Sequence, residues 1–189
     1  MRIWVVSAVG MAAAWAMAGA AQAAAPLAFN GVELGTSKAA WLALKTPASA
    51  SAHARRACSD EAAGAAAGLT AQGLGKGAVV CAVVDTYGRL RLPVTFTWER
   101  RYPMDHVSYV FTAGRLRQIR AVLPADAFDA VVADFKRSYG APSKDIRDQV
   151  KSEIGKLPRA TLRWATPAGS IELVDPSTPG KLSVRLTAR

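Results

Sequence analysis

Histidine and cysteine are scarce in this sequence, with two of each among its 189 residues. A structural zinc site takes several ligands, mostly from these two residue types, and no closely spaced group of them occurs here. The cysteines form neither a C-x-x-C pair for thiol exchange nor a C-x-x-C-H motif for haem attachment. We therefore expect no metal site and no cofactor.

Catalytic motifs are lacking as well. No serine stands in a G-x-S-x-G motif, which excludes the nucleophile elbow of the alpha/beta hydrolases. The spacing between His53 and Cys58 fits no pairing of a nucleophile with its base. Asp105 and His106 come just before a predicted strand that carries Ser108, where we expect solvated residues. The sequence predicts no catalytic residue and a protein that is not an enzyme, with an unrecognised hydrolase as the less favoured alternative.

A long, strongly apolar run occurs only at the start of the chain. Residues 3–17 carry no charge after the single Arg2, and Ala21 and Ala23 stand at the −3 and −1 positions of a cleavage site. This pattern predicts that residues 1–23 are a secretory signal peptide, cleaved after Ala23 or a nearby alanine. The apolar run is short for a membrane span, which disfavours an uncleaved anchor. We expect a periplasmic or secreted protein with no transmembrane segment after cleavage.

Acidic side chains are fewer than basic ones. Beyond the predicted signal peptide, 23 Lys and Arg stand against 14 Asp and Glu, a net charge of +9. Such an excess favours an anionic envelope component or an acidic protein as partner. Nucleic acid is disfavoured in that compartment, and no RNA-binding aromatic motif occurs. The alternative is simple colloidal charge on an arginine-rich protein.

The two cysteines, Cys58 and Cys81, predict one disulfide in an exported chain. It would close a loop of roughly 24 residues and stabilise the fold by roughly 3 kcal/mol. Cys81 lies within the apolar run 78–84, where a thiol would be buried and unreactive. A reactive thiol is therefore the less favoured alternative.

Strand patterns fill the middle and the end of the chain. The run 78–84 is continuously apolar, whereas 92–98 and 106–111 alternate between apolar and polar residues. Turn residues separate these runs, so we expect antiparallel strands. The predicted strands are residues 78–84, 92–98, 106–111, 116–123, 160–166, 170–175 and 181–188.

Helix patterns are fewer. A short helix with Thr36 or Ser37 as N-cap docks through Trp41. A polar helical stretch is expected at 144–154. The clearest amphipathic helix ends at Gly140. Its apolar residues are Phe128, Val131, Val132, Phe135 and Tyr139.

These elements predict a single α+β domain over residues 24–189. We expect a mostly antiparallel sheet of about six to seven strands with two helices packed on it. Residues 48–77, rich in Ala and Gly and without periodicity, predict a mobile loop that at most contains a helical turn at 60–67. The order helix, loop, strands occurs twice, which leaves open a diverged tandem α-β-β-β unit.

Arginines gather on the predicted strands. Arg89 and Arg91 flank Leu90 and therefore share one strand face, and Arg115 and Arg117 share another. Guanidinium groups suit the bidentate capture of phosphate or carboxylate. We predict that Arg89, Arg91, Arg115 and Arg117 bind the anionic partner, and the alternative is a solvated strand face.

Five short motifs carry a resemblance. They are N-G-V-E-L-G-T-S (30–37), the cysteine pair, F-T-A-G-R-L (111–116), Y-G-A-P (139–142) and L-R-W (162–164). They resemble a group of small, mostly uncharacterised exported bacterial proteins. The general plan is also similar to the outer-membrane assembly lipoproteins, whose anchor cysteine this chain lacks. A second similarity is to the helix-plus-sheet modules of the beta-lactamase inhibitor protein, for which a charge of +9 is unusual.

The resemblance implies a binding or assembly module rather than an enzyme. An inhibitor of an exported enzyme is the alternative function, and a chain this basic would then need an acidic target. The oligomeric state and the identity of the partner are left open by the sequence.

Overall fold

The computed structural model describes residues 26–46, 50–87, 90–94, 96–98, 102–152 and 155–189. The predicted signal peptide and the predicted binding residue Arg89 lie outside these residues. No helix in the described ranges is long and apolar enough to cross a membrane.

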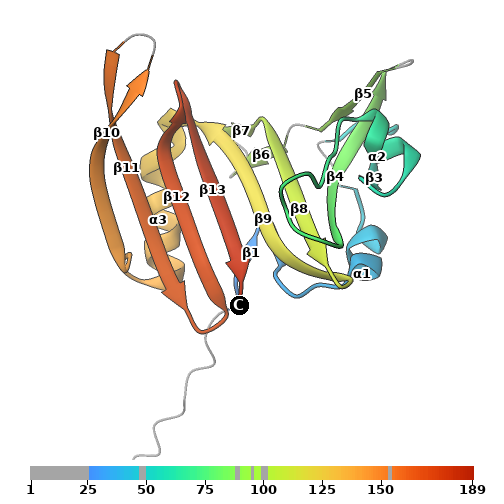
Figure 1. The fold of residues 1–189 in the computed structure, drawn as a ribbon, viewed down its shortest axis with the longest axis horizontal. Helices are drawn as coiled ribbons and strands as arrows, with labels where there is room; N and C mark the ends of the chain where they lie inside the picture. Colours follow the sequence, from blue (N-terminus) through green and yellow to red (C-terminus); the bar gives the residue numbers. More distant parts are fainter. Residues whose placement is uncertain (1–25, 47–49, 88–89, 95, 99–101, 153–154) are drawn as a thin grey trace, which may run out of the picture.

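One antiparallel sheet of nine strands dominates the fold (Figure 1). Its strands are β3 (Arg55–Cys58), β4 (Ala78–Tyr87), β5 (Leu90–Pro93), β8 (His106–Thr112), β9 (Arg115–Pro124), β10 (Lys144–Ser152), β11 (Gly155–Thr166), β12 (Gly169–Thr178) and β13 (Lys181–Ala188). They lie in the order β10-β11-β12-β13-β9-β8-β4-β3, and β5 pairs with the other half of β4. Two short ladders are separate from it: β1 (Ala28–Phe29) with β2 (Val32–Glu33), and β6 (Phe96–Trp98) with β7 (Tyr102–Met104).

The expected fold class is confirmed in its coarse form, since the chain is α+β with a large antiparallel sheet, but it has more strands than predicted. The last three predicted strands correspond to β11, β12 and β13. The single strand expected at 92–98 is wrong: β5 ends at Pro93, and Phe96–Trp98 form β6, which pairs with β7 in a separate ladder. β4 pairs directly with β8 instead.

The polar helix expected at 144–154 is also wrong. Residues 144–152 form β10, whose partner β11 lies on one side only, so that β10 is an edge of the sheet (Figure 1). Its side chains are exposed or half-buried on both faces, and no apolar alternation marks it as a strand. Charged residues on an edge strand also discourage pairing with other chains.

Two helices pack through buried tryptophans. The long helix α3 (Phe128–Tyr139) follows a short turn η1 (Ala125–Ala127) and lies behind β11 and β12 in Figure 1. Its Phe135 meets the ring of Trp164 edge-on at 5.5 Å between centroids, and the Trp164 indole N–H donates to the Gly140 carbonyl at 2.9 Å. The amphipathic helix predicted to end at Gly140 is therefore confirmed.

The short helix α1 (Lys38–Ala43) is confirmed with Ser37 as its N-cap, because the Ser37 hydroxyl accepts from the Ala40 N–H at 3.1 Å. Trp41 is fully buried against the rings of Tyr109 and Phe111 on β8, with centroids 5.0 and 5.8 Å away. The buried apolar residues of both halves of the chain form one continuous core.

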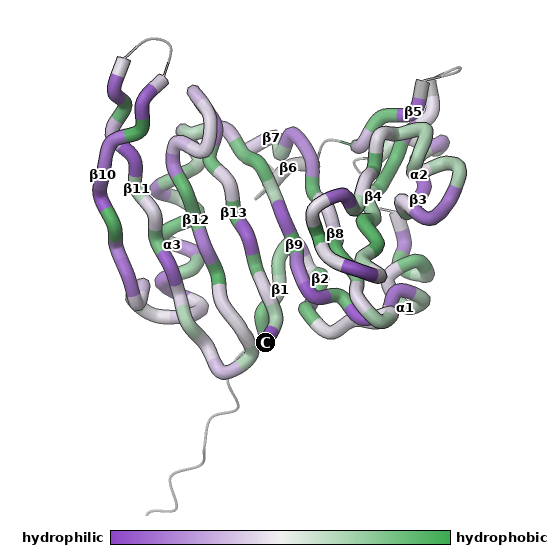
Figure 2. The backbone as a smooth tube through the Cα atoms, in the orientation of Figure 1, coloured by the Kyte–Doolittle hydropathy of each residue, from purple (hydrophilic) through white to green (hydrophobic). Residues whose placement is uncertain are grey.

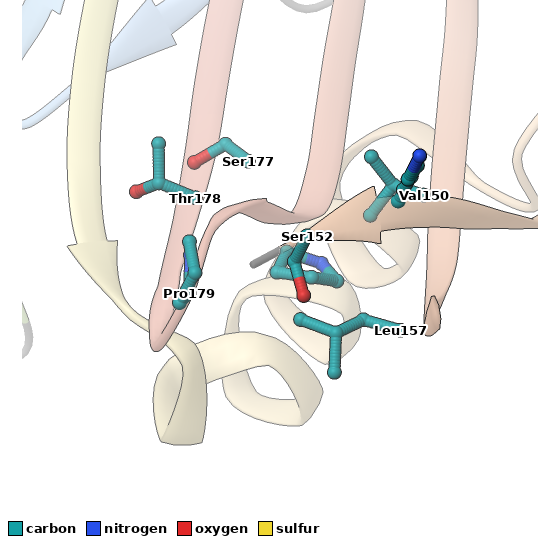
Figure 3. Close-up of a pocket in the computed structure, with 8 residues that line it drawn as sticks. Val150, Ser152, Leu157, Ser177, Thr178 and Pro179 are labelled. Atoms are coloured by element: carbon teal, nitrogen blue, oxygen red, sulfur yellow. The ribbon is translucent and has the colours of Figure 1, made fainter. Parts of the chain in front are cut away.

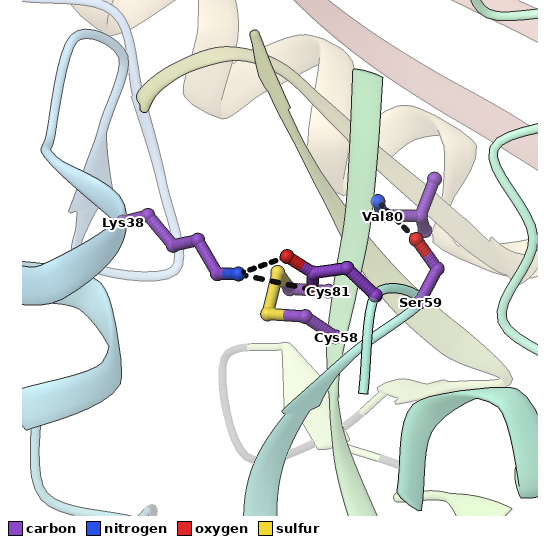
Figure 4. Close-up of polar contacts among 6 residues, drawn as sticks. Lys38, Cys58, Ser59, Val80 and Cys81 are labelled. Carbon is purple, nitrogen blue, oxygen red and sulfur yellow. Dashed lines mark hydrogen bonds and ion pairs between the residues drawn. A yellow bond between two sulfur atoms is a disulfide. The ribbon is translucent and has the colours of Figure 1, made fainter. Parts of the chain in front are cut away.

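The segment expected to be a long loop at 48–77 contains the strand β3 and a one-turn helix α2 (Ala62–Ala66) in its described part. The predicted disulfide is confirmed: Cys58 and Cys81 are direct register partners on β3 and β4, with an S–S distance of 2.04 Å (Figure 4). Beside it, Lys38 on α1 forms an ion pair with Asp60 at 2.7 Å. After α1 the chain therefore forms one strand and a second helix before β4, whereas α3 is followed by four consecutive strands.

Candidate functional site

The sheet has one covered face and one open face. On the covered face, register partners on successive strands form a row of buried side chains, which we name the buried row. It continues through Cys81 to Cys58. Its other members are Trp164, Ile171, Leu186, Ile119 and Tyr109. Burial raises the pKa of Tyr109 to about 12, while Arg56 opposes that rise.

The open face lies opposite the helix α3. Successive side chains of a strand point to opposite faces, so each neighbour of a buried-row residue points to the open face. On β9, β11, β12 and β13 those neighbours are exposed or half-buried, and Figure 2 shows hydrophilic segments alternating with hydrophobic ones along β9, β12 and β13. Toward the other edge the neighbours Val110, Val80, Ala82 and Ala57 are buried, so the open face is confined to β9 to β13.

A row of charged side chains crosses the open face, and we name it the charged row. Its members are direct register partners on five adjacent strands, from the edge strand β10 to β9. Adjacent strands lie about 4.8 Å apart, so the row is about 19 Å long. Its residues are Lys144, Arg163, Glu172, Arg185 and Arg120.

The single acid in this row is shared. Glu172 accepts from Arg163 at 2.7 Å and lies 3.6 Å from Arg185. Arg120 has no carboxylate partner within the described ranges, and its Nε–H donates to the side-chain oxygen of Gln118. Lys144 is exposed and, among described residues, forms no ion pair either. The row therefore carries more positive charge than the protein itself neutralises.

Arg120 and Arg185 are the most informative pair. They stand directly opposite each other on β9 and β13. Burial, and secondly the charge of Arg185, lower the pKa of Arg120. Like charges directly opposite in a sheet are destabilising, and a guanidinium stays charged at neutral pH. An anion placed between the two groups would remove this repulsion.

The side chains on either side of the charged row are uncharged. On one side, Gln118 donates to the hydroxyl of Thr187 at 3.2 Å, and Ser170 is the next register partner. Among the described residues, neither flanking row contains an aromatic side chain, so no ring covers the charged groups. The row on the other side consists of Val122, Ser183, Val174, Thr161 and Ile146.

A hollow of about 580 Å³ lies between the end of β10 with the start of β11 and the turn from β12 to β13 (Figure 3). Two hydroxyl groups in its wall donate within the chain, Ser152 to the Gly155 carbonyl at 2.8 Å and Ser177 to the Lys181 carbonyl at 3.2 Å. The wall is therefore mainly apolar. Its residues are Val150, Lys151, Ser152, Leu157, Pro176, Ser177, Thr178 and Pro179.

A smaller hollow of about 240 Å³ lies near the start of α3. Burial, and secondly the charge of Asp129, raise the pKa of Asp175 there. A raised carboxyl pKa suits a general acid. The second carboxylate at this hollow, Asp148, is held by Arg159 at 2.6 Å, and that hydrogen bond lowers its pKa. Asp148 is therefore not a free base, and Asp129 does not line the hollow, so the hollow gives the hydrolase alternative no support.

The arginines predicted from the sequence are only partly brought together. Arg115 and Arg117 lie at one end of β9, where they donate to the carbonyl oxygens of Gly35 at 3.3 Å and Arg189 at 2.9 Å. Arg91 pairs with Thr86 on the half of β4 that β8 does not contact. Arg89 lies outside the described residues. The structure thus separates Arg91 from Arg115 and Arg117.

The charged row escaped the sequence analysis because it depends on register between distant strands. Arg120 and Arg185 are adjacent only because β13 pairs with β9. One signal was available in the sequence: side chains alternate along a strand, so Arg163 must point away from the face of its buried neighbour Trp164. The solvated position expected for Asp105 and His106 agrees with the structure, where both are exposed and Asp105 pairs with a lysine at 2.8 Å.

No family model, curated protein or solved structure matches this chain. The resemblance to exported binding modules stays an expectation, and the open face is the feature from which a function can be inferred.

Proposed function

We propose that this protein is a non-enzymatic binding module of the cell envelope that holds an anionic partner against the charged row. The observation that carries the proposal is the facing pair Arg120 and Arg185, which has only a shared, more distant carboxylate for compensation. A protein gains nothing in stability from such a pair, because the two charges repel each other. When phosphate or carboxylate groups bind, the same two arginines form charge-assisted hydrogen bonds, and these stabilise the complex.

The architecture supports this use of the open face. Along β9 to β13, the helix α3 and the apolar core lie on the other side of the strands, so a partner can be bound there without rearranging the fold. The disulfide fits an oxidising compartment, which agrees with the signal-peptide pattern of residues 1–23. Both features favour a role outside the cytosol.

Two charge-matched double variants test the proposal. The first, Arg120→Gln with Arg185→Gln, removes the facing pair. The second, Arg115→Gln with Arg117→Gln, removes the same charge from the end of β9 and serves as the matched control. Inorganic polyphosphate and poly-glutamate are the probes, measured by titration calorimetry at fixed ionic strength.

We expect the first variant to bind at least one probe about tenfold more weakly, since two charge-assisted contacts are lost. The control should change by less than about threefold, because screening weakens general charge effects. Equal losses in both variants would show that overall charge, or the end of β9, is responsible, and the proposal would fail. Loss of poly-glutamate binding alone would identify carboxylate as the preferred group.

A further inference from the structure

The charged row and the large hollow belong to the same face of the sheet. Val150 and Leu157 are register partners in the hairpin β10–β11. Alternation from Thr161 and Ile146 places both of them in the series that points to the open face. Figure 3 shows Val150 and Leu157 on one side of the hollow and Pro179 on the other. A ligand lying on the open face can therefore reach both features.

The size and wall of this hollow suit an apolar group. Its volume of about 580 Å³ is within the usual range for small-molecule sites. Leu157 and Val150 are half-buried, and two prolines close the opposite side. The hydroxyl protons of Ser152 and Ser177 are already donated to carbonyl groups of the chain. The wall thus offers mainly apolar surface for an alkyl chain, with Lys151 and Thr178 as the other residues that carry side-chain donors.

Along β12, the surface between the charged row and the hollow carries no charge. Glu172 belongs to the charged row, Val174 follows it on the same face, and Pro176 lines the hollow. Glu172 and Pro176 are four residues apart, or about 13 Å along a regular strand. The facing arginines lie one and two strands beyond Glu172, so the head group is about 15 Å from Pro176. Val174 is half-buried, and its register partner Thr161 adds a methyl group beside it. A medium-length alkyl chain covers this distance.

The head group is defined by the facing arginines. Arg120 and Arg185 together present two guanidinium forks on neighbouring strands. A phosphate monoester carries up to two charges and three terminal oxygens, which can accept from both forks, whereas a carboxylate has two oxygens and one charge. The pair is therefore better matched by phosphate.

We infer that the partner of the open face is an amphiphile with a phosphate head group and a single alkyl chain. The head group lies against Arg120 and Arg185, and the chain runs past Val174 into the hollow beside Leu157. This inference rests on the proposed function, because it assigns the anion of that proposal a chemical class and adds a second contact site.

Three soluble probes separate the two contacts. Dodecyl phosphate carries both groups, butyl phosphate carries the head group with a short chain, and dodecyl maltoside carries the chain with a neutral head. Each is titrated below its micelle concentration. The variant Leu157→Trp fills the hollow, and Leu42→Trp, at an exposed position of α1, is its matched control.

We expect the unaltered protein to bind dodecyl phosphate at least about tenfold more tightly than either other probe, because both apolar burial and ion pairing contribute. In Leu157→Trp, the affinities for dodecyl phosphate and butyl phosphate should differ by no more than about threefold. In Leu42→Trp, the ratio of these affinities should be the same as in the unaltered protein. Retained binding of butyl phosphate by Leu157→Trp would confirm that the variant is folded.

Two results would overturn the inference while leaving the proposed function intact. One is equal binding of dodecyl and butyl phosphate, since the chain would then contribute nothing. The other is equal binding of dodecanoate and dodecyl phosphate, which would contradict the phosphate assignment. If Arg120→Gln with Arg185→Gln binds dodecyl phosphate as tightly as the unaltered protein, the head group does not use the charged row, and the inference fails for that reason. Absence of binding to every anion tested would overturn the proposed function as well.

Discussion

The buried row and the charged row are neighbours in the sequence, yet they have opposite properties. Four members of each row are adjacent in the chain to a member of the other, as with Trp164 and Arg163 or Leu186 and Arg185. Trp164 is 1% exposed and touches α3, whereas Arg163 is exposed and touches one carboxylate. The same strands therefore supply stability through one face and leave the other face free for a partner.

The largest effect on stability is expected at the α3 end of the buried row. Trp164→Ala removes the edge contact with Phe135 and the hydrogen bond to Gly140, and it leaves a cavity between the sheet and the helix. We expect a loss of about 3–5 kcal/mol in the free energy of unfolding, measured by urea denaturation.

The neighbouring Arg163→Ala provides the contrast for this prediction. That side chain is exposed, and its ion pair with Glu172 is of the surface kind, so the loss should stay below about 1 kcal/mol. If Trp164→Ala and Arg163→Ala lowered the free energy of unfolding by similar amounts, the open face would contribute to stability as much as the covered face. That result would contradict the contrast between the two rows.

A smaller but still large effect is expected at the other end of the buried row. Replacing Cys58 and Cys81 together by alanine removes the covalent link between β3 and β4. The unfolded chain then gains the freedom of the loop, and we expect a loss of roughly 3 kcal/mol. Hydrogen exchange measures where the loss occurs.

Protection in this variant should fall in β3 and β4, while β12 and β13 keep theirs, because the latter are held by α3 and the apolar core. Reduction of the unaltered protein with dithiothreitol should give the same exchange pattern. Uniform loss over all strands would show that the disulfide supports the whole sheet.

Local patterns in the sequence were sufficient for the elements that have a strong apolar face. The helix built on Val131 and Phe135 and the strands from Ala160 onward were predicted because their buried residues repeat at helical or strand spacing. The disulfide followed from the number of cysteines and the predicted export. These features depend on residues that are close together in the chain or of rare type.

The elements that were missed have no apolar face of their own. β10 is exposed on both sides and becomes a strand only through its pairing with β11. β3 is a short strand within an Ala/Gly-rich segment, and its pairing with β4 is fixed by the disulfide. The charged row needs the register between β9 and β13, whose positions are more than sixty residues apart. Tertiary pairing decides all three, and a single sequence does not encode it in a local pattern.

The smallest effect, and the one with the opposite sign, is expected in the charged row. Arg120→Gln removes one charge of the facing pair and keeps a polar side chain that can still contact Gln118. We expect the free energy of unfolding to rise by about 0.5 kcal/mol, because the repulsion from Arg185 is relieved. The same variant should bind polyphosphate more weakly than the unaltered protein. Higher stability together with weaker binding is the behaviour of a residue retained for function rather than for folding. A clear loss of stability in Arg120→Gln would instead mean that this guanidinium supports the sheet, and the charged row would then be part of the structure that the buried row already explains.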